Sequence, residues 1–100
     1  MKNLEALVKK IRDRRNKNSD KSYTSSLLSG GLSKCIDKMQ EEFGELIEAL
    51  KDNSNVVHEA ADTIYHILVT LEAADIKFED VLKELEDRKK QSGIEEKKNR

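Results

Sequence analysis

Residues 59–71 read EAADTIYHILVTL, and Glu59 and Asp62 are the only two acids in thirteen otherwise uncharged residues. The apolar run around them predicts a helix over about residues 56–73 that is buried on most sides. A carboxylate on a buried helix needs a partner, because burying an unpaired charge is very costly. The partner can be a Lys or Arg side chain or a divalent cation, and the run alone leaves both open.

The segment before this run predicts a second helix, from a Ser33 N-cap to about Lys51. Its expected core positions recur at helical spacing: Ile36, Met39, Phe43, Leu46, Ile47 and Leu50. Residues 52–55 are polar and predict a turn, so the two helices should be antiparallel neighbours.

Four glutamates lie within this second predicted helix: Glu41, Glu42, Glu45 and Glu48. Glu42 and Glu45 fall on neighbouring turns of one face, opposite the apolar stripe. Taken alone, these acids are more typical of a solvated acidic face. Across the hairpin, however, they could converge with Glu59 and Asp62 on one point, where hard carboxylate oxygens would suit Mg²⁺ or Mn²⁺.

The flanking segments predict further helices. Residues 4–15 carry apolar side chains at i, i+3, i+4 and i+7, residues 25–29 form a possible short helix, and Gly30-Gly31 interrupts the chain. A last helix starts near Phe78 and is expected to bury four residues: Phe78, Val81, Leu82 and Leu85. We therefore predict an all-α, up-and-down bundle of four main helices over residues 1–90, followed by a polar tail over 91–100.

Composition agrees with this fold class, because 39% of the 100 residues are charged, 4% are aromatic and none is proline. The net charge of −1 does not favour nucleic acid as a partner. No apolar run is long enough to cross a bilayer, and the single cysteine, Cys35, excludes an internal disulfide. A cytoplasmic enzyme or binding module is expected, and helices with so much polar surface favour a homodimer.

The acidic motifs resemble those of a known superfamily. Glu41-Glu42-x-x-Glu45 followed by Glu59-x-x-Asp62 is similar to the signature of the MazG-like, all-α nucleotide pyrophosphohydrolases. Within it, residues 22–28 (SYTSSLL) resemble the SYTxxLL segment of the phosphoribosyl-ATP pyrophosphatases of histidine biosynthesis, and residues 59–69 resemble their EAADLLYHLLV stretch. Further matches are Gly31-x-x-Lys34, Lys38 and the FEDVL of residues 78–82.

The resemblance implies hydrolysis of phosphoribosyl-ATP to phosphoribosyl-AMP and pyrophosphate by a Mg²⁺-dependent, nucleotide-binding enzyme. The metal ligands it implies are Glu42, Glu45, Glu59 and Asp62. Glu41 becomes a fifth catalytic carboxylate. Candidate substrate residues are Lys34 and Lys38 for phosphates, with Arg12, Arg14 and Arg15 weaker, and Tyr23 and Thr24, which either shape the site or anchor their segment to the bundle.

One departure concerns residues 41–48, EEFGELIE, whose wording is closer to the MazG-type EExGEL motif. Gly44 inside a helix costs about 1 kcal/mol relative to alanine, which suggests a close approach of another group there. The departure keeps an alternative open, a (d)NTP pyrophosphohydrolase of nucleotide-pool housekeeping. A third possibility, different in class, is a helical interaction module with a merely solvated acidic face. No cyclohydrolase domain accompanies the motifs, so a free-standing enzyme is expected.

Overall fold

A computed structural model describes residues 2–16 and 22–89, and this part of the chain is helical throughout its regular structure. The predicted tail over 91–100 and the polar segment over 17–21 lie outside the described residues. The elements, in order, are α1 (Lys2–Asp13), a 3-10 turn (Arg14–Asn16), α2 (Tyr23–Ser29), α3 (Gly31–Asp52), α4 (Val56–Ala73) and α5 (Phe78–Arg88). The all-α fold is confirmed. None of these helices has the length and apolar character needed to span a membrane.

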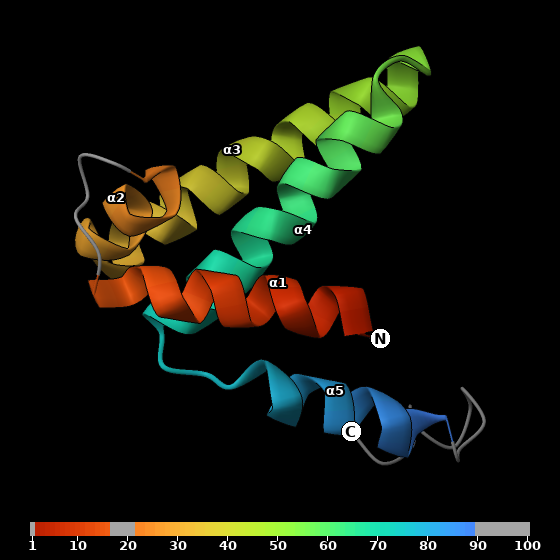
Figure 1. The fold of residues 1–100 in the computed structure, drawn as a ribbon. Coiled ribbons are helices and arrows are strands. Elements are labelled where there is room, and N and C mark those ends of the chain that lie inside the picture. The colour runs from red at the N-terminus through yellow and green to blue at the C-terminus, as the bar shows by residue number, and fades with distance from the viewer. Residues whose placement is uncertain (1, 17–21, 90–100) are drawn as a thin grey trace.

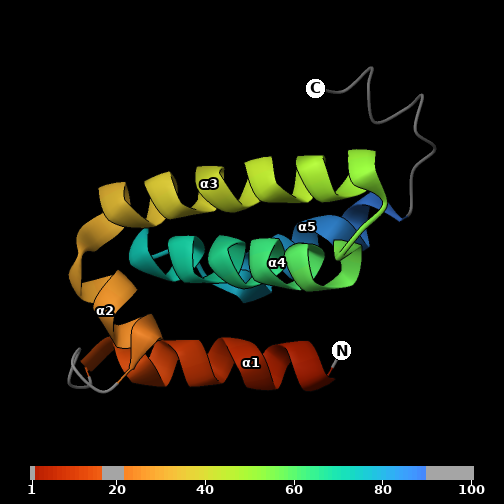
Figure 2. The same ribbon diagram turned by 90° about the horizontal axis from the view of Figure 1, so that it is seen from above.

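The long antiparallel hairpin of α3 and α4 dominates the molecule (Figures 1 and 2). Asn53 and Asn55 take the left-handed conformation, with φ of 52° and 56°, and so turn the chain within a few residues. Asparagine tolerates this conformation better than most residues. The predicted turn over 52–55 and the predicted span of α4 are both confirmed.

Two threonines hold the hairpin closely together. The Thr63 hydroxyl lies 3.2 Å from the Glu42 carbonyl oxygen, and the Thr70 hydroxyl lies 3.2 Å from that of Cys35. Each hydroxyl also lies within 2.8 Å of a carbonyl oxygen of its own helix, four residues earlier. The seven-residue spacing on both helices keeps one face of α3 against one face of α4 over their shared length.

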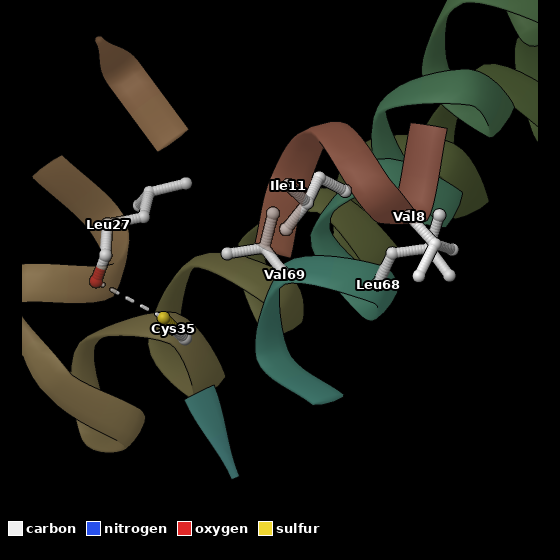
Figure 3. Packing of buried hydrophobic residues seen from close by; sticks show 6 residues of the cluster. All are labelled: Val8, Ile11, Leu27, Cys35, Leu68 and Val69. Carbon is white, nitrogen blue, oxygen red and sulfur yellow. Dashed lines mark hydrogen bonds between the residues drawn. The ribbon is translucent and has the colours of Figure 1, made fainter. Parts of the chain in front are cut away.

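The core lies at the opposite end of the hairpin from its turn, where α1 and α2 cover α4 and the start of α3 (Figure 3). It consists of six buried side chains, namely Val8, Ile11, Leu27, Cys35, Leu68 and Val69. Cys35 is a packing residue, and its thiol donates to the Leu27 carbonyl oxygen at 3.3 Å. The turn-proximal half of the hairpin projects beyond α1 (Figure 1).

The predicted start of α3 was wrong. Ser33 does not cap this helix, because α3 already begins at Gly31, whose φ of +89° makes the bend from α2. Only a glycine adopts that angle without strain. Ser22 instead caps α2, and its side chain accepts a hydrogen bond from the Ser25 backbone amide at 3.2 Å.

Two expected apolar faces are not buried within the chain. On α3, the stripe at Ile36, Phe43, Ile47 and Leu50 is 38–58% exposed, because α4 packs on the adjacent face through Cys35 and Ala49. On α5 none of the four expected residues is fully buried, and Leu85 is 53% exposed. α5 lies at the end of α4, so only its first turns can reach the core. Part of α4 is also open, since Ile64 is 51% exposed.

The expected close approach at Gly44 is absent from the described part of the chain. A β-carbon placed there would meet no atom within 4 Å. The cost of this glycine in the helix is therefore not offset by packing among the described residues.

Candidate active site

The register of the hairpin brings the carboxylates of α3 and α4 together. Because Thr63 lies against the Glu42 carbonyl, Glu59, one turn earlier on α4, faces the turn of α3 that carries Glu45. Oxygen atoms of Glu42, Glu45 and Glu59 all lie within 4.8 Å of one another. The predicted convergence across the hairpin is thus present in the structure for these three residues.

Asp62 joins this cluster through Glu59. A second group, of His58, Glu59 and Asp62, also offers ligand atoms within 4.8 Å of one another. His58 Nε2 lies 3.2 Å from Asp62 Oδ2, and both residues are partly open to solvent. We call the four residues Glu42, Glu45, Glu59 and Asp62 the carboxylate cluster. Glu41 stands outside it and pairs with Lys38 at 3.3 Å.

Burial and mutual repulsion make the ionised carboxylates of the cluster energetically unfavourable. Partial burial raises the pKa of Glu42 above its ordinary value, and the neighbouring Glu45 raises it further, while His66 opposes the shift. Burial likewise raises the pKa of Glu59, with Glu45 again the second cause. Glu42 Oε2 and Glu59 Oε2 are also buried without a hydrogen-bond partner among the described residues. Buried polar oxygens normally have one.

These observations fit a divalent cation. Within residues 2–16 and 22–89, no Lys or Arg forms an ion pair with Glu42, Glu45 or Glu59. The donor set is made of hard carboxylate oxygens, which are the usual ligands of Mg²⁺ and Mn²⁺. Two of those oxygens, Glu42 Oε2 and Glu59 Oε2, are buried and have no hydrogen-bond partner among the described residues. Of the two partners left open by the sequence, the geometry favours a cation over a basic side chain.

An open groove of about 570 Å³ adjoins the cluster on the side of the hairpin turn. It is lined by residues of α3 and of the turn, together with Glu59: Glu41, Gly44, Glu45, Glu48, Ala49, Asp52, Ser54, Asn55 and Glu59. Gly44 therefore opens onto this groove. Its walls are mainly acidic, so an anionic ligand would need counter-charge from a metal or from a cationic side chain.

The predicted basic residues divide into two groups. Lys38 is beside the carboxylate cluster, and the Glu41 carboxylate raises its pKa. Lys34 lies one turn earlier on α3 and its stem lies along Gly30. Arg12 and Arg15 are elsewhere, in ion pairs with Glu72 at 3.5 and 2.7 Å. Glu72 lies roughly 15 Å along α4 from Asp62, and these ion pairs link α1 and the 3-10 turn after it to α4. No ion pair of Arg14 is found among the described residues.

Tyr23 and Thr24 anchor α2 to α4. The Tyr23 hydroxyl lies 3.1 Å from His66 Nε2, and the Thr24 hydroxyl forms a short hydrogen bond with the Tyr65 hydroxyl. The rings of Tyr23 and Tyr65 stack with centroids 6.4 Å apart. Of the two roles that the sequence left open, anchoring is therefore present. Tyr23 also lies close enough to Lys38 and Glu42 for their charges to affect its pKa, which burial raises.

Three further side chains support the site, one that the sequence left open and two that it did not indicate. His66 lies four residues after Asp62, a spacing compatible either with a role behind the metal ligands or with simple packing, and the structure shows it buried and hydrogen-bonded at both ring nitrogens. Thr63 and Thr70 were not singled out, although their seven-residue spacing on an apolar helix matches that of Glu42 and Cys35 on α3.

Comparison with known proteins adds an independent finding. Residues 4–89 match the family described as phosphoribosyl-ATP pyrophosphohydrolase. A phosphoribosyl-ATP pyrophosphatase of Roseobacter denitrificans is 48% identical over 97% of this chain and 94% of its own length. One from Rhizobium etli is 44% identical over 93% and 90%. A histidine biosynthesis bifunctional protein of Helicobacter hepaticus is 48% identical over 97% of this chain and 43% of that protein.

Proposed function

The chain belongs to the phosphoribosyl-ATP pyrophosphohydrolase family, and from this we propose that it hydrolyses phosphoribosyl-ATP to phosphoribosyl-AMP and pyrophosphate in histidine biosynthesis. The family match covers residues 4–89, which is nearly all of the described structure. The observation that carries the proposal at the level of chemistry is the pair of unpartnered oxygens on Glu42 and Glu59, which lie with Glu45 in a group of three glutamates that no Lys or Arg of the described residues pairs with. We place the reaction in the cytoplasm.

In this proposal the four residues of the carboxylate cluster hold Mg²⁺, or Mn²⁺ in its place. When bound, the ion neutralises phosphate charge and lowers the pKa of a bound water. Glu42 and Glu59 supply their unpartnered oxygens, while Glu45 and Asp62 complete the set from the more open side of the hairpin. The protein is asked mainly for positioning and electrostatics, which dominate phosphoryl transfer.

Two further side chains act on the substrate. Lys38 stands beside the cluster and is placed to meet a phosphate oxygen, with Lys34 one turn away. Glu41 lies 3.3 Å from the Lys38 ammonium and immediately precedes Glu42 on α3. We assign Glu41 the role of orienting the attacking water and accepting its proton.

We further propose that the enzyme works as a homodimer. The support is the exposed apolar stripe on α3, which continues on α4 at Val57 and Ile64. Contiguous apolar surface of this kind marks an interaction site. A second copy of the hairpin supplies a matching apolar face.

The function is tested by measuring pyrophosphate release with Mg²⁺, comparing phosphoribosyl-ATP with ATP and the four dNTPs. We expect strong preference for phosphoribosyl-ATP. Preference for a dNTP would keep the metal site and move the activity to nucleotide-pool housekeeping. Inactivity on every substrate would favour an interaction module.

Thermal melting tests the metal separately from turnover. A cation that binds only the folded state raises the melting temperature by mass action. We expect millimolar Mg²⁺ or Mn²⁺ to raise it in the wild type and not in an Asp62→Asn variant. An equal response of both proteins would contradict the assigned ligands.

A further inference from the structure

His66 is a buried residue that the proposed reaction has not used. It is 5% exposed and lies on α4, one turn after Asp62. Nδ1 lies 2.8 Å from the Asp62 carbonyl oxygen, and Nε2 lies 3.1 Å from the Tyr23 hydroxyl on α2. The ring also makes edge contacts with Tyr65 and Tyr23, with centroids 5.1 and 5.9 Å apart. Its position is therefore fixed from every described side.

The contact of Nδ1 determines whether this nitrogen of the His66 ring carries a proton. A carbonyl oxygen only accepts, so Nδ1 must carry a proton. In the neutral ring Nε2 then accepts from the Tyr23 hydroxyl, and in the protonated ring Nε2 donates to the hydroxyl oxygen, so the contact is a hydrogen bond in either state. The imidazole therefore joins the Tyr23 hydroxyl to the backbone of Asp62.

The hydrogen bonds of His66 connect two parts of the proposed site. Asp62 belongs to the carboxylate cluster, and the His66 ring lies close enough to Glu42 to influence it electrostatically. At the other end, Tyr23 is 55% exposed although its hydroxyl is held. Lys38 and Glu42 are among the charges that reach this hydroxyl. The Tyr23 ring is thus half-exposed, is held through its own hydroxyl, and lies near the Lys38 ammonium and the Glu42 carboxylate. Such a ring presents a fixed surface to a ligand.

We infer that His66 is a positioning residue for the proposed reaction, and that it acts through Tyr23, whose ring it holds as a wall of the substrate site. The inference rests on the proposed function. Tyr23 is the substrate-contacting member, and the part of the substrate that suits an aromatic wall is the nucleoside, since the phosphates go to Lys38. His66 itself touches no substrate.

The parallel bond between Thr24 and Tyr65 supplies a matched control, because it also joins α2 to α4 but does not involve His66. Tyr23→Phe and Tyr65→Phe each remove one hydroxyl from this junction. His66→Asn keeps an amide nitrogen where Nδ1 lies but cannot reach Tyr23. His66→Gln places an amide near the Nε2 position and serves as the rescue variant.

The experiment measures kcat, KM and melting temperature for each variant in the full chain, with phosphoribosyl-ATP and Mg²⁺. We expect Tyr23→Phe and His66→Asn each to raise KM five- to tenfold, with kcat within threefold of the wild type. The double variant that combines Tyr23→Phe with His66→Asn should have the same KM as either single variant, because both substitutions remove the same hydrogen bond. His66→Gln should recover part of the loss. Tyr65→Phe should lower the melting temperature while keeping KM within twofold.

A spectroscopic measurement tests the hydrogen bonds without turnover. The chain has two histidines, so ¹⁵N NMR resolves their rings, and loss of one signal set in His66→Asn assigns it. We expect a protonated Nδ1 in wild-type His66 and a shifted Nε2 resonance in Tyr23→Phe. An unprotonated Nδ1, an unchanged KM in Tyr23→Phe, or an equal KM increase in Tyr65→Phe would each overturn the inference. A wild type inactive on phosphoribosyl-ATP would instead overturn the proposed function on which it rests.

Discussion

At the scale of single residues, Glu42 shows how function and stability oppose each other in this protein. It lies on the face of α3 that packs on α4, between Cys35 and Ala49, where an apolar side chain would ordinarily be expected. Its Oε2 atom has no partner among the described residues, and burial raises its pKa. When a carboxyl group has a higher pKa in the folded state than in the unfolded state, the folded protein loses stability as the pH rises through the folded-state pKa. Ionised Glu42 therefore destabilises the metal-free fold.

The first prediction follows for Glu42→Gln. Removing the charge should abolish pyrophosphate release, because a ligand is lost, and should raise the melting temperature of the metal-free protein, because the repulsion from Glu45 is relieved. The measurement pairs a turnover assay with melting curves in a chelator at pH 7. Asp37→Asn, an exposed acid on the same helix but outside the carboxylate cluster and the groove beside it, is the control and should change neither. Near-full activity in Glu42→Gln would show that the ligand assignment is wrong.

Gly44 gives the second prediction. Because a β-carbon there meets nothing within 4 Å, Gly44→Ala should stabilise the metal-free protein by about 1 kcal/mol, the difference in helix propensity. Urea unfolding followed by circular dichroism measures it. A loss of stability instead would show that another molecule packs closely against Gly44, as a second subunit could do.

The sequence predicted the carboxylate cluster better than its surroundings, for a physical reason. Helical spacing alone places Glu42 beside Glu45, and Glu59 beside Asp62, and the polar turn makes the two helices neighbours. Whether Tyr23 anchors its segment, and which hydrogen bonds His66 makes, both depend on how α2 packs on α4. The spacing of residues within one helix does not predict that packing. The ion pairs of Arg12 and Arg15 with Glu72 could not be predicted either, because an arginine side chain suits phosphate and carboxylate equally well.

At the scale of elements, a set of ion pairs binds α1 to the end of α4 and the start of α5. Arg15 pairs with Glu72 and with Asp75 at 2.7 Å each, and it also donates to the Glu72 carbonyl oxygen. Arg12 donates to both carboxylate oxygens of Glu79, at 3.0 and 3.3 Å. Because α5 has no fully buried residue, these bonds contribute more to its attachment than they would for a well-packed helix.

The third prediction concerns the pH dependence of this attachment. The hydrogen bond from Arg12 lowers the pKa of Glu79 below its ordinary value of 4.5. A lowered carboxyl pKa contributes stability above the unfolded pKa and loses it as pH falls through the folded one. Glu79→Gln should therefore melt at a lower temperature than the wild type at pH 7, and the difference should shrink at acid pH, as the pH falls below 4.5 and through the lowered pKa. Glu86→Gln, paired within α5 at 3.6 Å from Lys89, should show little difference at either pH. A pH-independent difference for Glu79→Gln would contradict the role of its charge.

Helix bounds were predictable where the signal was local. α4 was placed correctly from its apolar run, and its turn from four polar residues. The start of α3 was misplaced because the bend resides in the backbone angle of Gly31, which can also be read as a simple break. The burial of α5 was overestimated, since its apolar spacing shows which face is apolar but not whether another element covers that face.

At the scale of the whole molecule, the exposed apolar stripe explains an apparent failure of sequence analysis. Ile36, Phe43, Ile47 and Leu50 have the spacing of core residues, yet the chain leaves them 38–58% exposed. On α4, Val57 and Ile64 are exposed in the same way, seven residues apart. A pattern that predicts burial without naming the partner is satisfied equally by another helix of the chain or by a second copy.

The last prediction distinguishes those cases. Ile47→Glu places a charge in the centre of the stripe, and Leu85→Glu places one at an equally exposed apolar position on α5, 53% against 51%. If the stripe is the subunit interface, sedimentation at micromolar concentration should find a dimer for the wild type and Leu85→Glu, and a monomer for Ile47→Glu. The monomer should also melt at a lower temperature, because the stabilisation that association with a second copy gives to the folded state is lost. A monomeric wild type would refute the interface and leave the stripe to a different partner.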